Sequence, residues 1–375
     1  MTLRVGVNLL WCRPGKVGGS EQYLSRQLAG LLAVEHDGLE VSIFAPRGFA
    51  AAHGELAPLS ITESKSDCAN RGARIIRENT WLRSRTNDVQ IVHHGGGTIP
   101  FRTSGATLLT VHDVQYLTYP QYFSQTRLRY LSFMMPRSLR RADMIAVPSA
   151  YVRDTLVERF GIDSSRINVV VHGIESVDMS KVDVDATVGR VGLAGQRYFI
   201  YPAITHPHKN HRMLVDLMAG PWRHRDEHIV FIGGQGRAHA ELLAQVAASG
   251  ISHRVHFTGH VGSVDRDALI MGAEAVLFPS EYEGFGAPVA EAMALGVPVV
   301  ASNRASLPEV VGDGGLVLPI DIDAWADVPA RIDRDRDALV AAGLGRAQTF
   351  TLAASGRDLV AAYRALSALA GRNND

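Results

Sequence analysis

The sequence contains little cysteine and has no net charge. Cys12 and Cys68 are the two cysteines among 375 residues, and they form no CxxC pair. This usage is typical of a reducing compartment, and it excludes a disulfide framework and a cysteine-based zinc site. Lys and Arg together number 38, as do Asp and Glu, so general electrostatic attraction to nucleic acid is not expected.

Long apolar runs are also missing. No run approaches the ~18 residues that a membrane-spanning helix needs. The opening residues MTLRVGVNLL read as a strand, without the basic region and cleavage site of a signal peptide. We therefore expect a cytoplasmic protein. The stretch RLRYLSFMMPRSLRR (127–141) mixes arginines with apolar residues, and it predicts a packed helix with at most peripheral contact with the inner membrane face.

Two nucleotide-binding signatures are absent as well. FIGGQGRA, from Phe231, lacks the full GxGxxG pattern, and no acidic residue stands suitably at the end of the next strand, which argues against a dehydrogenase. No DxD follows a predicted strand, and the nearest run, DVDAT, begins at Asp183 in a polar segment. A cation-bridged diphosphate site is therefore not expected, and we predict no metal ligands and no organic cofactor.

What the sequence does contain is short β-branched runs alternating with segments of helical period, which predicts α/β architecture with parallel sheets. Six strands are expected before residue 175, and six more after residue 196. The polar stretch 175–196 sustains neither period and reads as a linker. We predict two doubly wound, Rossmann-like domains facing a cleft, 1–175 and 197–355. The amphipathic helix 356–371 is expected to cross back to the first domain.

The most informative stretch is YEGFGAPVAEAMALGVPVVASN (282–303). A buried strand precedes it, and PVAEAMALG has proline near a helix start and glycine after its end, so GFG forms the strand-to-helix turn. The amides at that helix start form an anion site. Glu283 and Glu291 flank it, and carboxylates accept strong hydrogen bonds from sugar hydroxyls. The combination indicates a nucleotide-sugar, although an acid in the first helical turns can also simply complement the helix dipole.

The string EGFGAPVAEAMALGVPVVASNRASLPEVVGDGG (283–315) resembles the donor-site signature of the large family of retaining glycosyltransferases that includes bacterial mannosyltransferases, sucrose-phosphate synthases and glycogen synthases. The resemblance implies a GT-B fold. It also implies that Glu283 contacts hydroxyls of the donor sugar and that Glu291 holds the ribose. The amides at Gly284, Phe285 and Gly286 would then line the sugar and the phosphates.

A second stretch, YPAITHPHKNH (201–211), follows a strand and opens a helix, and Lys209 stands at the family's donor-phosphate lysine. A fixed cation there would stabilise the charge that develops on the leaving diphosphate. Many family members add an arginine nearby, whereas here the two positions hold Ile204 and His208. His208 or Arg212 could assist, so a second cation is an open question.

Three further stretches match the family more weakly. Gly18 and Gly19, in the first strand–helix turn, would approach the donor phosphates. His112, in TVHD, corresponds to the histidine beside the donor sugar, although a lone histidine is often structural. The loop RVHFTGHVGS would hold the nucleobase near His260 and Val261.

The resemblance therefore implies a metal-independent, retaining hexosyltransferase with Glu283, Lys209 and His112 in catalysis. GDP-mannose is the favoured donor, and the acceptor would be a glycan or a lipid-linked saccharide. Alternatives are a transferase that uses a UDP- or dTDP-sugar, an epimerase or phosphorylase on the same plan, and a catalytically silent protein that binds a nucleotide-sugar.

Overall fold

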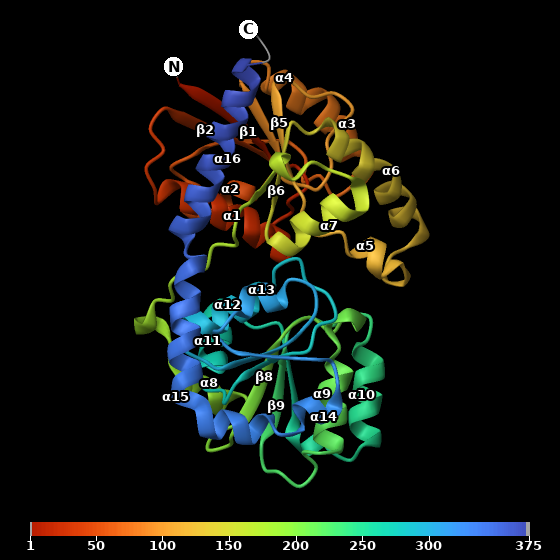
Figure 1. Ribbon diagram of the computed structural model, residues 1–375, viewed down its shortest axis with the longest axis vertical. Helices are drawn as coiled ribbons and strands as arrows, with labels where there is room; N and C mark the ends of the chain where they lie inside the picture. The colour runs from red at the N-terminus through yellow and green to blue at the C-terminus, as the bar shows by residue number, and fades with distance from the viewer. Residues whose placement is uncertain (1, 373–375) are drawn as a thin grey trace. The chain divides into compact units, whose positions relative to one another are not determined.

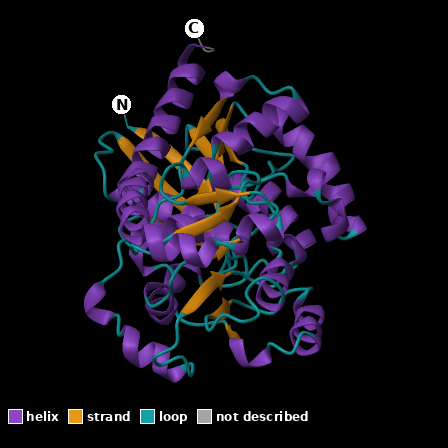
Figure 2. Cartoon of the chain, turned by 60° about the horizontal axis from the view of Figure 1, so that its bottom comes forward, coloured by secondary structure: helices purple, strands orange, loops and turns teal. Residues whose placement is uncertain are grey.

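The computed structural model describes residues 2–372, which divide into two compact units. Unit 1 comprises the chain up to residue 173 together with the chain from residue 350, and unit 2 comprises residues 174–349. In each unit the strands lie at the centre and the helices outside (Figures 1 and 2). Among the described residues, no helix combines the length and apolar character that crossing a bilayer requires.

The sheet of unit 1 has seven parallel strands in the order β3-β2-β1-β4-β5-β6-β7. The strands are β1 Leu3–Asn8, β2 Leu39–Ala45, β3 Ser60–Glu63, β4 Ile91–His94, β5 Ala106–Thr110, β6 Met144–Val147 and β7 Ile167–Val169. The sequence predicted six of these and missed β3, an edge strand whose residues are half-buried or exposed. An edge strand of this kind carries no run of buried β-branched residues for a pattern to detect.

Helices cover both faces of this sheet. They are α1 Gly19–Leu32, α2 Phe49–Ala52, α3 Arg71–Arg77, α4 Arg83–Arg85, α5 Gln115–Thr118, α6 Gln125–Arg141, α7 Ala150–Phe160 and α16 Leu352–Arg372, with the single turns η1 Gly54–Leu56, η2 Glu78–Leu82, η3 Pro120–Tyr122 and η4 Ser164–Arg166. Leu108 and Leu109 are neighbours in β5 but belong to separate buried clusters, one packed with α1 and α16 and the other with α6 and α7. Successive side chains of a strand point to opposite faces, so the sheet is buried on both sides.

The helix α16 returns to unit 1, as the sequence predicted, and packs along α1 (Figure 1). A Cβ on Gly30 would lie 2.1 Å from the Leu352 carbonyl oxygen, and one on Gly356 would lie 2.1 Å from the Gly30 carbonyl oxygen. Only glycine permits this approach of the two backbones. Farther along α16, the hydroxyl of Tyr363 lies 2.8 Å from Nδ1 of the buried His93 in β4.

Unit 2 has six parallel strands in the order β10-β9-β8-β11-β12-β13. They are β8 Tyr198–Pro202, β9 His228–Ile232, β10 Val255–Gly259, β11 Val276–Phe278, β12 Val299–Ser302 and β13 Leu316–Leu318. The helices are α8 Val184–Arg190, α9 His211–Ala219, α10 His239–Ala248, α11 Ser263–Met271, α12 Ala287–Ala294, α13 Leu307–Val311, α14 Ile322–Ala326 and α15 Val328–Ala347, with the single turns η5 Met179–Lys181, η6 Pro207–Lys209 and η7 Ser252–Arg254; η8 Gln348–Phe350 precedes α16.

One helix of unit 2 lies where the sequence predicted only a linker. The helix α8 begins after Asp183, whose side chain accepts a hydrogen bond of 2.9 Å from the Ala186 amide. It packs against α11. The stretch 175–196 is therefore partly helical, because a side-chain cap and tertiary packing support a helix that its own apolar period does not specify.

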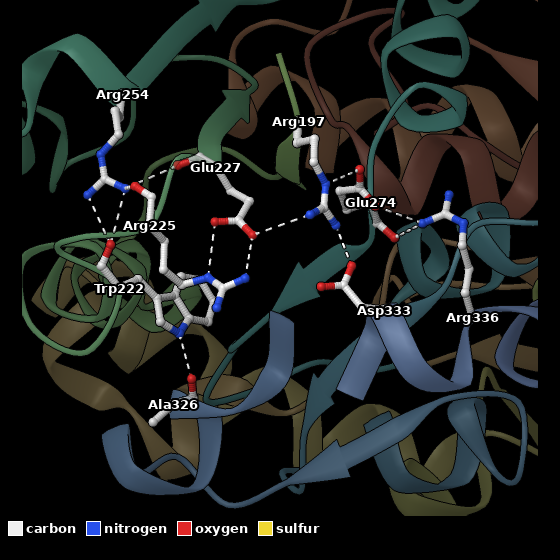
Figure 3. A network of polar contacts seen from close by, with 9 residues as sticks. All are labelled: Arg197, Trp222, Arg225, Glu227, Arg254, Glu274, Ala326, Asp333 and Arg336. Atoms are coloured by element: carbon white, nitrogen blue, oxygen red, sulfur yellow. Dashed lines mark hydrogen bonds and ion pairs between the residues drawn. The ribbon is translucent and has the colours of Figure 1, made fainter. Parts of the chain in front are cut away.

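A network of arginines and carboxylates holds the amino ends of the strands in unit 2 (Figure 3). Arg197 immediately precedes β8, and its guanidinium donates to Glu274 at 2.9 Å and also to Asp333 on α15. Glu227, before β9, is 5% exposed and accepts two hydrogen bonds from Arg225, at 2.6 and 3.0 Å. The network thus ties two strand starts to α15.

The strand order of each unit reverses at one place. In unit 1 this is between β1 and β4, and in unit 2 between β8 and β11. The loops after such neighbouring strands diverge to opposite sides of a sheet and leave a crevice at its carboxyl edge, where ligands of open α/β sheets bind. The residues after β8 and β11 in unit 2, and after β1 and β4 in unit 1, are therefore the first places to examine for a site.

Candidate functional site

The two residues at the centre of the predicted donor site are in contact in unit 2. The Lys209 ammonium lies 2.6 Å from Oε1 of Glu283, and the two side chains are 17% and 12% exposed. Lys209 ends the single turn η6 after β8, and Glu283 follows β11. The strand reversal between β8 and β11 therefore brings together two residues that are 74 positions apart in the sequence.

The backbone around Lys209 is fixed by hydrogen bonds to the same loop that carries Glu283. The buried Tyr201 hydroxyl donates to the Lys209 carbonyl at 2.7 Å and lies 2.8 Å from the Ser280 hydroxyl. The Glu281 amide donates to the His208 carbonyl at 2.8 Å. Burial, and next the Glu283 carboxylate, raises the pKa of Tyr201, so its hydroxyl keeps its proton and acts as a fixed donor.

The glycine turn between β11 and α12 presents its amides in a defined direction. Gly286 has a φ of +92°, and a Cβ there would meet the Leu307 side chain at 2.7 Å, so glycine is required. The carbonyls of Glu283 and Phe285 lie 3.0 and 2.9 Å from the Ser306 hydroxyl. The C=O and N–H of a trans peptide point in opposite directions, so the amides of Gly284 and Gly286 face away from Ser306. The helix α12 begins directly after this turn, so these amides belong to its amino-terminal end.

The second predicted carboxylate has a cationic neighbour that the sequence did not reveal. Glu291, in α12, is 7% exposed, and its Oε2 lies 3.7 Å from Nη1 of Arg266 in α11. Burial alone would lower the pKa of Arg266, but the carboxylates of Glu291 and Asp267 outweigh it and raise that pKa. Arg266 lies six residues beyond His260 in an ordinary amphipathic helix, so only the fold brings it to Glu291.

A pocket of about 270 Å³ opens at the carboxyl ends of β8, β9 and β10. Its lining includes Gly233, Phe257 and Thr258, and a Cβ on Gly233 would lie 2.7 Å from the Ala203 backbone. The rings of Phe231 and Phe257, with centroids 5.2 Å apart, both belong to the lining and give the pocket an apolar wall. His260, which is exposed, and Val261 follow the lining residue Gly259 directly but do not line this pocket themselves.

The histidines near Lys209 are uncharged at neutral pH. Burial, and next the Lys209 ammonium, lowers the pKa of His208 to about 3. Burial likewise lowers the pKa of His211 to about 3, and the His211 ring packs on Tyr201 with centroids 4.5 Å apart. Arg212 has an 81% exposed side chain near Asp216, at 3.7 Å. The lowered pKa leaves the His208 ring uncharged at neutral pH in this structure, and the Arg212 side chain is largely exposed.

In unit 1, Gly18 and Gly19 begin α1, and Gly18 has a φ of +76° that favours glycine. The loop before them is tethered by Glu21, whose two carboxylate oxygens each accept from the Gly15 amide at 3.0 Å. Glu21 also lies 3.2 Å from Nε2 of His53. The glycine turn is therefore held in one conformation.

His112 follows β5 in unit 1 and is held by its neighbours. Its Nε2 lies 2.8 Å from the Gly95 carbonyl oxygen, so this nitrogen carries the proton, and the ring packs against Trp11 and Tyr23 with centroids 5.6 and 5.5 Å away. Burial lowers the pKa of His112, which leaves the ring neutral with Nδ1 as an acceptor. A neutral histidine in this state can accept a hydrogen bond from a sugar hydroxyl.

The described residues offer neither a metal-binding cluster nor an activated cysteine. No group of three or more His, Cys, Asp or Glu side chains in residues 2–372 is arranged to hold a metal ion. Cys12 and Cys68 are both buried and unpaired. Burial raises the pKa of each thiol, so neither is an activated nucleophile.

The fold, together with the residues at the carboxyl edges of the two sheets, indicates the class of protein. The architecture is that of GT-B glycosyltransferases: the crystal structure of Anabaena Alr3699/HepE in complex with UDP and glucose matches with a TM-score of 0.75 at 20% identity, over 97% of this chain and 100% of that chain. The profile described as Glycosyltransferase Family 4 matches residues 17–176, and that described as Glycosyl transferases group 1 matches residues 190–339.

Proteins of similar sequence support the same assignment. The O-antigen chain mannosyltransferase B of Escherichia coli is 32% identical over 299 residues, which cover 77% of this chain and 78% of that protein. The MMP alpha-(1->4)-mannosyltransferase of Mycolicibacterium hassiacum is 30% identical over 271 residues, 67% of this chain and 63% of that protein. The chain belongs to the group 1 glycosyltransferases with GT-B architecture, and the family and fold predicted from the sequence are confirmed.

Proposed function

We propose that this glycosyltransferase moves a hexose from a nucleotide-sugar to an acceptor hydroxyl with retention of the anomeric configuration. The observation that carries the proposal is the 2.6 Å contact of Lys209 with Glu283 beside the glycine turn at the start of α12. A cation, directed amides and a carboxylate are the groups that a diphosphate and a sugar ring need together. Unit 2 is then the donor-binding half, and unit 1 the acceptor-binding half.

The proposed reaction assigns each group of unit 2 one task. Glu283 accepts hydrogen bonds from hydroxyls of the donor sugar, and Glu291, beside Arg266 at 3.7 Å, accepts them from the ribose. The pocket at Phe257 and Thr258 takes the base. Lys209, together with the amides of Gly284, Phe285 and Gly286, stabilises the charge that grows on the diphosphate as the glycosidic bond breaks.

The acceptor oxygen attacks the anomeric carbon from the face that the diphosphate leaves, and its proton passes to the departing phosphate oxygen. This route forms the new C–O bond as the old one breaks, and it needs no nucleophilic carboxylate. Lys209 and the helix start supply the neutralisation that a metal supplies in other transferases. In unit 1, His112 accepts a hydrogen bond from the donor sugar, and the turn at Gly18 and Gly19 approaches the phosphates.

We propose mannose as the hexose and GDP as the leaving nucleotide. The mannosyltransferase of E. coli, 32% identical, supports the sugar. The product would be a glycan, polysaccharide or glycolipid made in the cytoplasm, with the protein held at most peripherally at the membrane. The exposed Phe133 on α6, which has several arginines, is compatible with such contact.

The test begins with a thermal-shift screen of the purified chain, in which a tight ligand raises the apparent Tm. The ligands are GDP-mannose, GDP-fucose, UDP-glucose, UDP-N-acetylglucosamine, dTDP-rhamnose and ADP-glucose. The donor that binds is then incubated with acceptor extracts, and the anomeric configuration of the product is read by NMR with and without EDTA. Retention, with activity unchanged in EDTA, is expected. An inverted product, or activity abolished by EDTA and restored by a metal, would contradict the mechanism.

Two alternatives give different outcomes in the same experiment. Stabilisation by UDP- or dTDP-sugars instead of GDP-mannose would keep the mechanism and change the donor. Binding without transfer and without slow hydrolysis of the donor would identify a silent nucleotide-sugar-binding protein. The contact of Lys209 with Glu283 favours an active enzyme, because a protein that only senses the ligand gains nothing from stabilising a leaving diphosphate.

A further inference from the structure

A second pocket, of about 430 Å³, opens at the carboxyl edge of the sheet in unit 1. We call it the basic pocket, because its lining includes Lys16 after β1, Arg71 and Arg74 on α3, and Arg127 on α6. Asp113 is the one acidic side chain among its described lining residues. The lining therefore has a clear excess of positive charge in a chain whose formal net charge is zero.

The arginines of the basic pocket are held by aromatic rings as well as by charge. The Arg71 guanidinium lies 5.5 Å from the centroid of the Tyr130 ring, and that of Arg127 lies 5.1 Å from the centroid of the Phe123 ring. Arg74 is partly compensated, with Nε 3.8 Å from the Glu78 carboxylate. An aromatic ring stacks on the flat face of a guanidinium, whereas the N–H donors of the guanidinium point outward in its plane. Arg71 and Arg127 are thus oriented without losing the donor geometry that suits an oxyanion.

Two further groups of the lining are hydrogen-bond donors without a partner. The Tyr116 side chain is 5% exposed, and its hydroxyl makes no hydrogen bond within residues 2–372; the same is true of the buried Nε1 of Trp11. Burial raises the pKa of Tyr116 to about 12, so the phenol remains a donor at any physiological pH. Buried donors are rarely left unsatisfied without a reason. Both residues belong to the lining of the basic pocket, and we infer that a ligand rich in acceptor oxygens would draw these two buried donors to the pocket surface.

The same lining offers aromatic surface for a ring. Trp11 lies against Gly96 so closely that a Cβ there would be 2.6 Å from the indole Cδ1, which fixes the plane of the indole. Tyr130 presents its ring beside Arg71. Flat side chains of this kind pack against the C–H face of a sugar. The basic pocket therefore combines surface for a sugar ring with donors for an anion.

We propose that the basic pocket binds an acceptor saccharide that bears a phosphate ester or a diphosphate. Several cationic side chains and two neutral donors exceed what the single charge of a carboxylate would need, whereas a phosphate monoester or a diphosphate carries about two charges and several acceptor oxygens. The identification of this ligand as the acceptor rests on the proposed function, in which unit 2 takes the donor. The anion site itself stands on the geometry of unit 1 alone.

The first experiment measures binding, separately from transfer. Mannose 1-phosphate and methyl α-mannoside are titrated calorimetrically into the native chain, into the double variant Arg71→Gln/Arg127→Gln, and into the control Arg129→Gln/Arg140→Gln. The control removes the same charge from exposed positions of α6 outside the pocket lining. We expect the native chain and the control to bind the phosphate at least about 10-fold more tightly than the uncharged glycoside, and the double variant to lose that preference.

A third variant guards against loss of folding. Tyr116→Phe removes only the unpartnered hydroxyl, so it should keep the native Tm and weaken binding of mannose 1-phosphate by about 3- to 10-fold. Equal affinity for the charged and uncharged probes in the native chain, or native affinity for the phosphate in the double variant, would overturn the proposal.

The second experiment distinguishes the source of the phosphate. Transfer from the donor found in the screen is assayed with mannose 1-phosphate in buffer and with a polyprenyl diphosphate-linked monosaccharide in detergent. Transfer to either one supports the proposal and identifies the acceptor as soluble or lipid-linked. Phosphate binding that depends on Arg71 and Arg127, without transfer from any donor that binds, would overturn the acceptor role and the proposed function together. Donor binding and transfer only to uncharged saccharides would overturn this inference and leave the proposed function in place.

Discussion

Two groups of ion pairs in unit 2 differ in how completely their carboxylates are paired. At the amino ends of the strands, Glu274 accepts from Arg197 at 2.9 Å and from Arg336 at 3.0 Å, and Glu227 is held bidentately by Arg225 (Figure 3). At the carboxyl ends, Glu283 has one cationic partner within residues 2–372, Lys209, at 2.6 Å. A carboxylate with several fixed partners has no capacity for a ligand, whereas one with a single flexible partner can exchange it.

The comparison separates stability from function within one sheet. The amino-end network joins strand starts to α15, and its loss should destabilise unit 2 without altering chemistry. The carboxyl-end pair joins two loops, and its loss should remove chemistry with little effect on folding. Substitutions of matched type at the two edges test this division directly.

The largest effect is expected at the carboxyl edge. Replacing Glu283 or Lys209 by alanine should lower kcat about 10²- to 10³-fold, the usual loss when one preorganised electrostatic group is removed. Steady-state kinetics with the identified donor give kcat for each variant, and calorimetry gives the Tm of the same variants. Full activity in both variants would show that the division between the two edges is wrong.

Glu291→Gln should have the next largest effect. It keeps the shape of the side chain and removes the charge beside Arg266, so the KM for the donor should rise about 10-fold, through weaker hydrogen bonds to the ribose. The value of kcat should change far less, because in the proposed reaction the ribose contact would be made equally in the ground state and the transition state. A selective fall in kcat would assign Glu291 to the reacting centre.

At the amino edge, Glu227→Gln should act on stability alone. Glu227 is 5% exposed, and loss of its charged hydrogen bonds to Arg225 should reduce the free energy of unfolding by about 1–3 kcal/mol. The Tm should fall by roughly 3–10 °C for a unit of this size, while kcat at 25 °C stays unchanged. Loss of kcat in the folded variant would make this edge part of the active site.

As the pH falls, the contributions of His211 and Glu227 to the free energy of unfolding should be lost in different pH ranges. His211 has its folded pKa lowered to about 3 from a usual 6.5, so the unfolded chain binds more protons, and the stability it contributes is lost as pH falls from 6.5. Burial opposes the shift at Glu227, but Arg225 outweighs it and lowers the pKa below the usual 4.5, so its contribution is lost only at lower pH. Urea unfolding from pH 7 to 4 should therefore be flatter between pH 6.5 and 5 in His211→Gln than in Glu227→Gln.

The smallest effect is expected for Arg212→Ala. Its side chain is 81% exposed, and its pair with Asp216, at 3.7 Å, is of the surface type that contributes at most about 0.5 kcal/mol. The KM for the donor should stay within about twofold of the native value, because Arg212 is directed to solvent. A 10-fold rise would identify it as the second phosphate-binding cation.

Much of this arrangement could be predicted from the sequence, for a physical reason. Four of the six strands of unit 2, β8, β9, β11 and β12, are short runs that are almost entirely buried. The GFG turn with its flanking acids is a local feature that a contiguous stretch encodes. Lys209 could be singled out from the sequence because η6 is likewise a local turn after a strand. Features whose determinants lie within about ten residues of each other are accessible to pattern reasoning.

The rest depends on contacts between distant segments. Arg266 meets Glu291 only because α11 and α12 lie on the same sheet. Arg71 and Tyr116 line one pocket from separate connections, and neither residue belongs to a motif that predicts an anion site. The sequences of the edge strand β3 and the capped helix α8 show only a weak periodicity of apolar residues. Their secondary structure is therefore determined by tertiary packing. Sequence patterns thus predicted the contact neighbours Lys209 and Glu283 in unit 2, and they did not predict the basic pocket of unit 1.

The return of α16 to the first unit has a consequence for biosynthesis. Unit 2 is one uninterrupted stretch, 174–349, whereas unit 1 needs α16 to cover the sheet face at His93 and Tyr363. On the ribosome, unit 2 can complete its fold while unit 1 still exposes an apolar face, and unit 1 closes only once the stretch 352–372 has emerged. Chaperones that act on nascent chains would therefore engage this enzyme through its earliest-made part, and for longest.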